Sequence, residues 1–98
     1  MAWELTWAPS ARLDLRELAS YIAESRPLAV GRFVRQVLQL AEQLADFPES
    51  GRVVPEFDDP SIREVIRRPC RIVYRVKSQT KTIEIVRIWH AARGIPEL

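Results

Sequence analysis

The feature that most constrains this chain is a row of large apolar residues spaced alternately three and four positions apart. The row consists of Val30, Phe33, Val37, Leu40, Leu44 and Phe47. This spacing places all six on one side of an α-helix and is typical of a helix that packs closely along a partner. Such a seam belongs to a protein's own core more often than to an interface with another chain. Pro48 disfavours helical geometry in the residue before it, so we expect the helix to end at Phe47.

The partner helix is expected directly upstream. Leu15, Leu18 and Ile22 are three and four residues apart and form a second apolar stripe. Ser10 is suited to cap the start of this helix, and Pro27 is suited to the first turn of the helix that follows. The turn between the two helices is only a few residues long, so we expect an antiparallel helical hairpin.

After a loop over residues 48–61, which is rich in turn-forming residues, the apolar period changes from helical to two. Alternating segments at 62–67, 71–77 and 82–90 predict three strands, the last two joined by a hairpin turn at 78–81. Residues 3–7 alternate in the same way and predict a short strand before the helices. The predicted architecture is α+β: an N-terminal strand, an antiparallel helical hairpin and then a three- to four-stranded antiparallel sheet, all within one domain over residues 1–98.

Composition excludes several classes of protein. The chain is 47% hydrophobic, which rules out a disordered chain. It carries no signal-peptide layout and no apolar stretch long enough to span a membrane. The single cysteine, Cys70, and the single histidine, His90, cannot build an internal disulfide or an ordinary structural zinc site. We therefore expect a cytoplasmic protein with no cofactor, no metal and no membrane contact, in which Cys70 fills space in the core.

Positive charge is concentrated in the last third of the chain, since residues 62–93 hold nine Lys or Arg and two Asp or Glu. One interpretation is a binding surface for an anion such as nucleic acid, the ribosome or an acidic protein. The other interpretation is a solvated sheet face that keeps the protein in solution. The candidate binding residues are Arg63, Arg75, Arg87 and Arg93.

A metal-free catalytic set is also conceivable, because Glu56, Arg71, His90 and Arg93 all lie at predicted element boundaries where segments can converge. In RNA backbone cleavage, Glu56 would deprotonate the 2′-hydroxyl and His90 would protonate the leaving oxygen. Arg71 would stabilise the negative charge of the phosphorane. The alternative is that the carboxylate and the arginines form ion pairs while His90 caps the sheet.

These segments, in this order, resemble the RelE/ParE superfamily of toxins from bacterial toxin–antitoxin modules over nearly the whole chain. The residues that carry the resemblance are Trp7, Ala11, Asp14 and Leu15 before and within the first helix, Phe47, Pro48, Gly51 and Arg52 after the second, and the segments 54–56, 62–64, 71–76 and 85–93. The resemblance implies a small toxin that a co-expressed antitoxin neutralises by wrapping it with a C-terminal segment, in a hetero-oligomer.

The superfamily has two classes of target. RelE-like members cut messenger RNA on the ribosome, and ParE-like members poison DNA gyrase. The pattern of segments 71–76 and 85–93 is closer to ParE, so a gyrase inhibitor is the first hypothesis. Glu56, Arg71 and His90 fall at or near positions where RelE-like nucleases carry their functional groups. His90 is one residue out of register, since Trp89 occupies the position that matches the nuclease residue. A ribosome-dependent messenger RNA endoribonuclease is therefore the alternative, and an inactive former toxin kept as a binding module is the third hypothesis.

Overall fold

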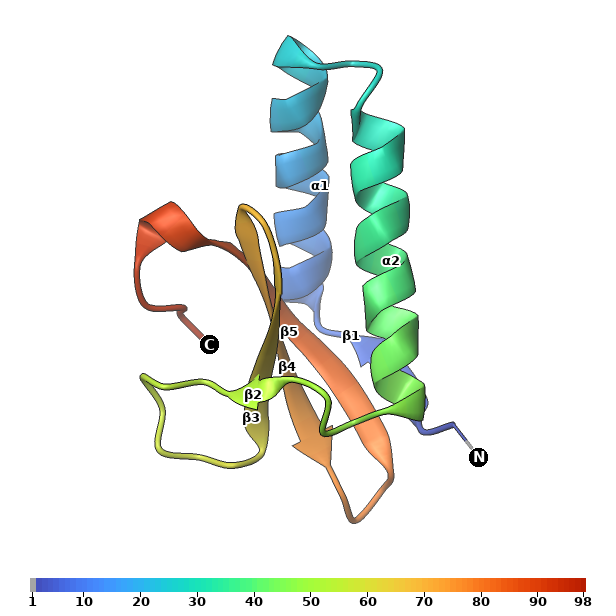
Figure 1. Cartoon of the computed structure of the whole chain (residues 1–98), viewed down its shortest axis with the longest axis vertical. Helices are drawn as coiled ribbons and strands as arrows, with labels where there is room; N and C mark the ends of the chain where they lie inside the picture. The colour runs from blue at the N-terminus through green and yellow to red at the C-terminus, as the bar shows by residue number, and fades with distance from the viewer. Residues whose placement is uncertain (1) are drawn as a thin grey trace.

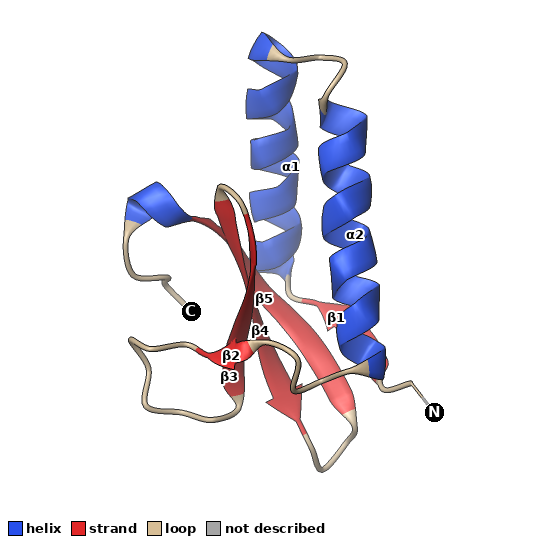
Figure 2. Cartoon of the chain, viewed as in Figure 1, coloured by secondary structure: helices blue, strands red, loops and turns tan. Residues whose placement is uncertain are grey.

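The protein consists of a two-helix hairpin packed on one face of a five-stranded sheet. A computed structural model describes residues 2–98. Figures 1 and 2 show the helices and the strands as separate layers, with the turn between the helices projecting beyond the strands. The elements in chain order are β1 (Glu4–Trp7), α1 (Pro9–Ser25), α2 (Val30–Asp46), β2 (Arg52–Val53), β3 (Ile62–Arg67), β4 (Cys70–Lys77), β5 (Thr82–His90) and the 3₁₀ helix η1 (Ala91–Arg93). The predicted α+β class with an antiparallel helical hairpin is confirmed.

The sheet has the strand order β1-β5-β4-β3-β2. Strands β2 to β5 pair antiparallel, and β1 joins the far side of β5 in parallel, with Leu5 opposite Ile83. Strand β5 therefore lies inside the sheet, which agrees with the buried residues on both of its faces. Strand β2 was missed: it has only two residues within the segment expected to be loop, too few to show a period of two.

The middle of the predicted seam on α2 is confirmed, and its C-terminal end is wrong. Phe33, Val37 and Leu44 are buried against the sheet together with Ala41. The helix ends at Asp46, and Phe47 at its C-cap is 66% exposed. The run of apolar residues thus continues one step beyond the surface that the sheet covers.

Two predicted helix ends also differ from the structure. Pro27 lies in the turn between the helices, because α2 begins only at Val30. Ser10 lies inside the first turn of α1, after Ala8 at the N-cap and Pro9. Its hydroxyl donates a hydrogen bond to the carbonyl of Val86 at 2.8 Å, so it ties α1 to the sheet instead of capping the helix.

The core lies on both faces of the sheet. Ile72 and Tyr74 of β4 face the helices, and Val73 between them contributes to a smaller cluster on the opposite face. The register between β4 and β5 shifts between Val73 and Tyr74. This bulge changes the alternation along β5, so that Ile85 and Ile88 both face the helices although they are three residues apart. We use the term distal face below for the sheet face that lies away from the helices.

Candidate functional site

The distal face carries a group of charged side chains that the sheet positions. Strand alternation and register bring Glu64 of β3, Arg71 of β4 and Arg87 and Trp89 of β5 to this face. The loop between β2 and β3 adds Glu56 at one side, and the segment after η1 adds the carbonyl of Gly94. Two polar clusters result, one centred on Arg71 and one on Trp89.

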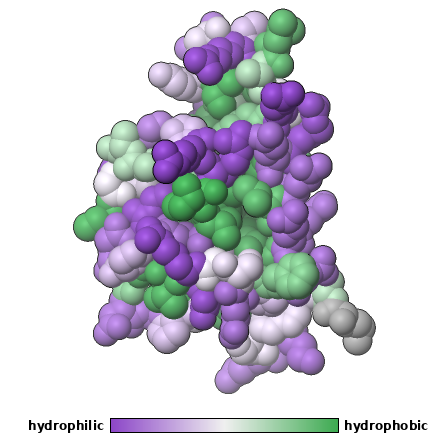
Figure 3. Space-filling view, viewed as in Figure 1, coloured by the Kyte–Doolittle hydropathy of each residue, from purple (hydrophilic) through white to green (hydrophobic). Residues whose placement is uncertain are grey.

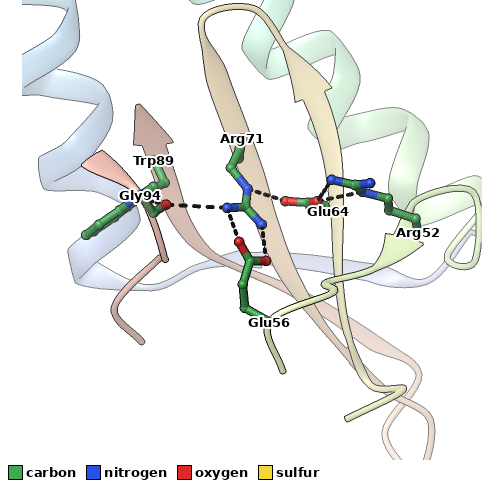
Figure 4. A network of polar contacts seen from close by, with 6 residues as sticks. All are labelled: Arg52, Glu56, Glu64, Arg71, Trp89 and Gly94. Carbon is green, nitrogen blue, oxygen red and sulfur yellow. Dashed lines mark hydrogen bonds and ion pairs between the residues drawn. The ribbon is translucent and has the colours of Figure 1, made fainter. Parts of the chain in front are cut away.

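Arg71 is the centre of the first cluster (Figure 4). Its Nε donates to Glu64 Oε1 at 2.5 Å, and its two terminal nitrogens donate to the two oxygens of Glu56 at 3.0 and 2.7 Å. One of those nitrogens also donates to the carbonyl oxygen of Gly94 at 3.4 Å. The second oxygen of Glu64 accepts from Arg52 at 2.7 Å. We call these four residues, Arg52, Glu56, Glu64 and Arg71, the Arg71 cluster.

The charges of the Arg71 cluster cancel, since it contains two guanidinium groups and two carboxylates. The hydrogen bonds that Arg71 donates to Glu56 lower the pKa of Glu56 and raise the pKa of Arg71. Glu64 has a fully buried side chain, and the side chain of Arg71 is 10% exposed. The cluster is therefore a neutral, internally satisfied network, in which a carboxylate of lowered pKa is a weak base.

The second cluster stacks two arginines on one indole ring. The guanidinium carbon of Arg87 lies 4.6 Å from the ring centroid of Trp89, and that of Arg93 lies 4.0 Å from it. Arg87 is also held by both oxygens of Asp14, at 2.8 and 2.9 Å, and Asp14 raises its pKa. Asp14 further accepts the backbone N–H of Ile88 at 3.0 Å, along the part of β5 that β1 does not cover. Arg93 is left as the exposed cation of this cluster.

The structure brings Glu56 and Arg71 into direct contact and pairs His90 with a different residue of β4. His90 pairs across the sheet with Cys70, which faces the helices, whereas Arg71 and Trp89 form the neighbouring pair on the distal face. The Nδ1 atom of His90 accepts a hydrogen bond from the N–H of Ala92 at 3.1 Å. Strand register thus turns His90 away from the Glu56–Arg71 contact, although Arg71 and His90 still line one pocket of about 500 Å³, and the catalytic role of the three residues stays a prediction.

The four predicted binding arginines do not share one surface. Arg63 and Arg75 lie on opposite faces of the sheet, and Arg63 donates to the carbonyl of Gly51 at 2.9 Å. Arg87 and Arg93 meet only through Trp89. Their role in binding stays a prediction.

Sequence reasoning missed two carboxylates that organise this face. Glu64 interrupts an apolar strand face at a position where a lone charge requires a buried partner, and that is the signal by which it could have been found. Asp14 was named for the family resemblance, and its partner Arg87 is 73 residues away, so no local pattern reveals the pair. Between residues 2 and 98, no group of three or more His, Cys, Asp or Glu side chains is arranged to hold a metal ion. No helix in the same stretch is long and apolar enough to cross a membrane.

Comparison with known proteins identifies the family. The model of the ParE toxin of type II toxin–antitoxin systems (parDE) matches residues 5–95. Toxin RelE2 of Caulobacter vibrioides is 32% identical over 90 residues, which are 92% of this chain and 97% of that toxin.

Two solved structures share the fold. A chain of the chromosomal ParDE system of P. aeruginosa superposes with a TM-score of 0.74 at 24% identity, covering 91% of this chain and 96% of that one. A chain of the toxin–antitoxin complex RelBE2 of Mycobacterium tuberculosis superposes with a TM-score of 0.67 at 21% identity, covering 92% and 99%. The predicted superfamily is confirmed, and the chain belongs to the ParE toxin family of type II toxin–antitoxin systems, within the RelE/ParE superfamily.

Proposed function

We propose that this toxin acts by inhibiting DNA gyrase rather than by cutting RNA. The observation that carries the proposal is the state of Arg71, the one arginine that the predicted catalytic set assigned to a phosphate. Its guanidinium already donates to Glu64, to both oxygens of Glu56 and to a backbone carbonyl. A guanidinium whose donors are taken by two carboxylates has little capacity left for a phosphorane.

The arrangement of the acid–base candidates supports the same proposal. A general acid and a general base must both reach the reacting atoms within hydrogen-bond distance. Glu56 lies beside the distal face, whereas His90 pairs across the sheet with Cys70, a residue that faces the helices. The hydrogen bonds from Arg71 also lower the pKa of Glu56, which weakens it as a base. The match to the ParE family model agrees with a toxin that needs no catalytic residues of its own.

Ribosome-dependent cleavage of messenger RNA is the second candidate, and one specific observation favours it. Glu56 and Arg71, two of the three predicted catalytic residues, are in direct contact at 2.7 Å. Displacement of Glu56 by a substrate would free two N–H groups of a buried guanidinium at the same place. The 32% identical relative carries the name Toxin RelE2, which agrees with this alternative.

The proposed partner is a cognate antitoxin, as in the ParDE and RelBE2 systems of the two solved structures. The helical hairpin offers apolar side chains for such a partner, because Leu28 is 99% exposed and Tyr21 is 66% exposed. Burial of these side chains by a second chain would contribute favourable free energy to the complex.

Controlled expression of the chain in a bacterium, with two parallel readouts, tests this proposal. Growth should stop, plasmid DNA should lose negative supercoiling, and ribosome-bound messenger RNA should stay intact. Cleaved messenger RNA with normal supercoiling would support the second candidate instead. Undisturbed growth at full soluble expression would indicate an inactive former toxin that is kept as a binding module.

A further inference from the structure

The turn between α1 and α2 carries a leucine that no part of the described chain covers. Figures 1 and 2 show this turn projecting beyond the strands, and Figure 3 shows apolar surface at the same end beside hydrophilic side chains. Leu28 is 99% exposed, the largest exposed fraction among the large apolar residues between residues 2 and 98. Pro27 and Ala29 on either side of it are exposed as well. We call residues 26–29 the hairpin tip.

The hairpin tip is a closed turn with fixed geometry. The N–H of Ala29 donates to the carbonyl of Arg26 at 3.0 Å, and the N–H of Arg26 donates to the carbonyl of Ile22 at 2.6 Å. Pro27 occupies the second position of this β-turn, where proline is favoured because its ring fixes φ at the required value. Leu28 is therefore held at the apex by the backbone on both sides, so its insertion into a partner would cost little conformational entropy.

Positive charge surrounds the hairpin tip. Residues 21–35 contain three arginines and one glutamate, a net charge of +2. Arg26 belongs to the tip and Arg32 follows it in the first turn of α2, and both are exposed. The Nη1 atom of Arg35 lies 3.4 Å from the place that a Cβ on Gly31 would take, so this side chain reaches back along α2 toward the tip. No ion pair in the described part of the chain involves any of the three arginines, which leaves their charge to an outside anion.

The shape and chemistry of the hairpin tip favour DNA over a protein surface. A stable protein–protein interface buries about 800 Å² on each partner. The apex instead presents one large apolar side chain between cations, on a single turn of chain. Proteins that enter the minor groove of DNA use this combination, because an apolar wedge such as leucine or proline partly unstacks a base step while arginines contact the phosphates nearby.

We propose that the hairpin tip inserts Leu28 into the minor groove of double-stranded DNA at a flexible base step, while Arg26 and Arg32 contact the phosphates beside that step. Steps such as TA unstack easily, so the tip should favour a duplex that contains one over a stiff A-tract. The inference goes beyond the proposed inhibition of gyrase, since it makes DNA, the substrate of that enzyme, a molecule that the toxin itself contacts. An antitoxin that covers Leu28 would also keep the tip away from DNA.

A binding experiment with the full-length chain and no gyrase tests the inference. Fluorescence anisotropy with a labelled duplex of about 20 base pairs measures the affinity, and 2-aminopurine placed in a central TA step measures unstacking. The parent chain should bind the duplex at low salt and raise the 2-aminopurine fluorescence. It should also bind this duplex about fivefold or more tightly than an A-tract duplex of the same length.

Two variants separate the wedge from the charges. Leu28→Ser should abolish both the rise in 2-aminopurine fluorescence and the preference for the TA step, because it removes the side chain that unstacks the bases. The Arg26→Gln, Arg32→Gln double variant should weaken binding to both duplexes. It should also make the slope of log K against log salt shallower by about 2, since each phosphate contact contributes about 0.9 to that slope.

The matched controls are Leu13→Ser and the Arg12→Gln, Arg16→Gln double variant, which make the same changes at exposed positions of α1 away from the tip. Both should behave like the parent chain. The inference is overturned if the parent chain does not bind the duplex, if either variant of the tip behaves like its control, or if single-stranded RNA binds more tightly than the duplex.

A supercoiling assay on the same proteins keeps this inference separate from the proposed function. Inhibition of gyrase by a parent chain that does not bind DNA would overturn only the inference about the hairpin tip. Binding of DNA with the expected loss in Leu28→Ser, but without inhibition of gyrase, would support the inference and contradict the proposed function.

Discussion

The Glu64→Gln substitution tests whether the Arg71 cluster is a structural network. Glu64 has a fully buried side chain, and each of its oxygens accepts from a different arginine. Glutamine keeps the shape and one acceptor oxygen, but it removes the charge and turns an N–H₂ group toward one guanidinium. The contact with Arg71 would change from a charged to a neutral hydrogen bond in a buried setting, while Arg71 still keeps Glu56. Arg52 is 62% exposed and can return to water. We expect a loss of about 2–3 kcal/mol in the free energy of unfolding.

Equilibrium unfolding in urea measures this loss. The matched control is Glu84→Gln, which breaks the partly exposed pair with Lys77 at 3.3 Å and should cost no more than about 1 kcal/mol. A double-mutant cycle between Glu64→Gln and Arg71→Gln should give a coupling of about 1–3 kcal/mol, and the cycle with Arg52→Gln should give less. If Glu64→Gln costs no more than Glu84→Gln, the buried network does not hold the distal face together, and the reasoning is wrong.

Three further predictions concern the core, a close contact and pH. Leu44→Ala should lower the free energy of unfolding by about 2–5 kcal/mol because Leu44 is 2% exposed, whereas Leu38→Ala at a 41% exposed position should cost much less in the same urea assay. Gly51→Ala should lower the melting temperature, because a Cβ there would lie 2.5 Å from the carbonyl of Glu64 and 2.6 Å from the hydroxyl of Tyr74; an unchanged melting temperature would contradict this contact. The hydrogen bonds from Arg71 lower the pKa of Glu56 below its usual 4.5 in the folded state, so unfolding takes up protons at acid pH. The stability that this pair confers is therefore present above about pH 4.5 and is lost as the pH falls through the folded pKa. The free energy of unfolding should therefore decline more steeply on acidification in the parent chain than in Glu56→Gln, as urea titrations at successive pH values would show.

Most of the fold could be predicted because local patterns determine it. The spacing of Phe33, Val37 and Leu44 matches the helix period, and the bounds of β3 and β5 match the alternation along the sequence. The parallel pairing of β1 with β5 could not be predicted, since it joins residues more than seventy positions apart and no local pattern encodes it. The bulge between β4 and β5 was also missed, because alternation alone does not reveal one extra residue in a strand.

The candidate site was less predictable for the same physical reason. Residue types pointed correctly to Glu56 and Arg71 as neighbours, but a side chain's partner depends on strand register and face. A shift of one residue along β5 decides whether His90 or Trp89 faces Arg71, and here the paired residue is Trp89. Glu64 completes the network from β3, so a set interpreted as catalytic from sequence has its charges cancelled in the fold.

Gyrase inhibition by purified protein tests the central claim most directly, when the parent chain and Glu56→Gln are compared in a DNA supercoiling assay with a ribosome-bound messenger RNA cleavage assay beside it. The Glu56 side chain is 29% exposed and glutamine has nearly the same shape, so the account predicts equal inhibition of gyrase by both proteins and no RNA cleavage by either. The contradicting result is an active supercoiling reaction in the presence of both proteins, together with RNA cleavage by the parent chain that Glu56→Gln lowers by about 10²–10⁴-fold.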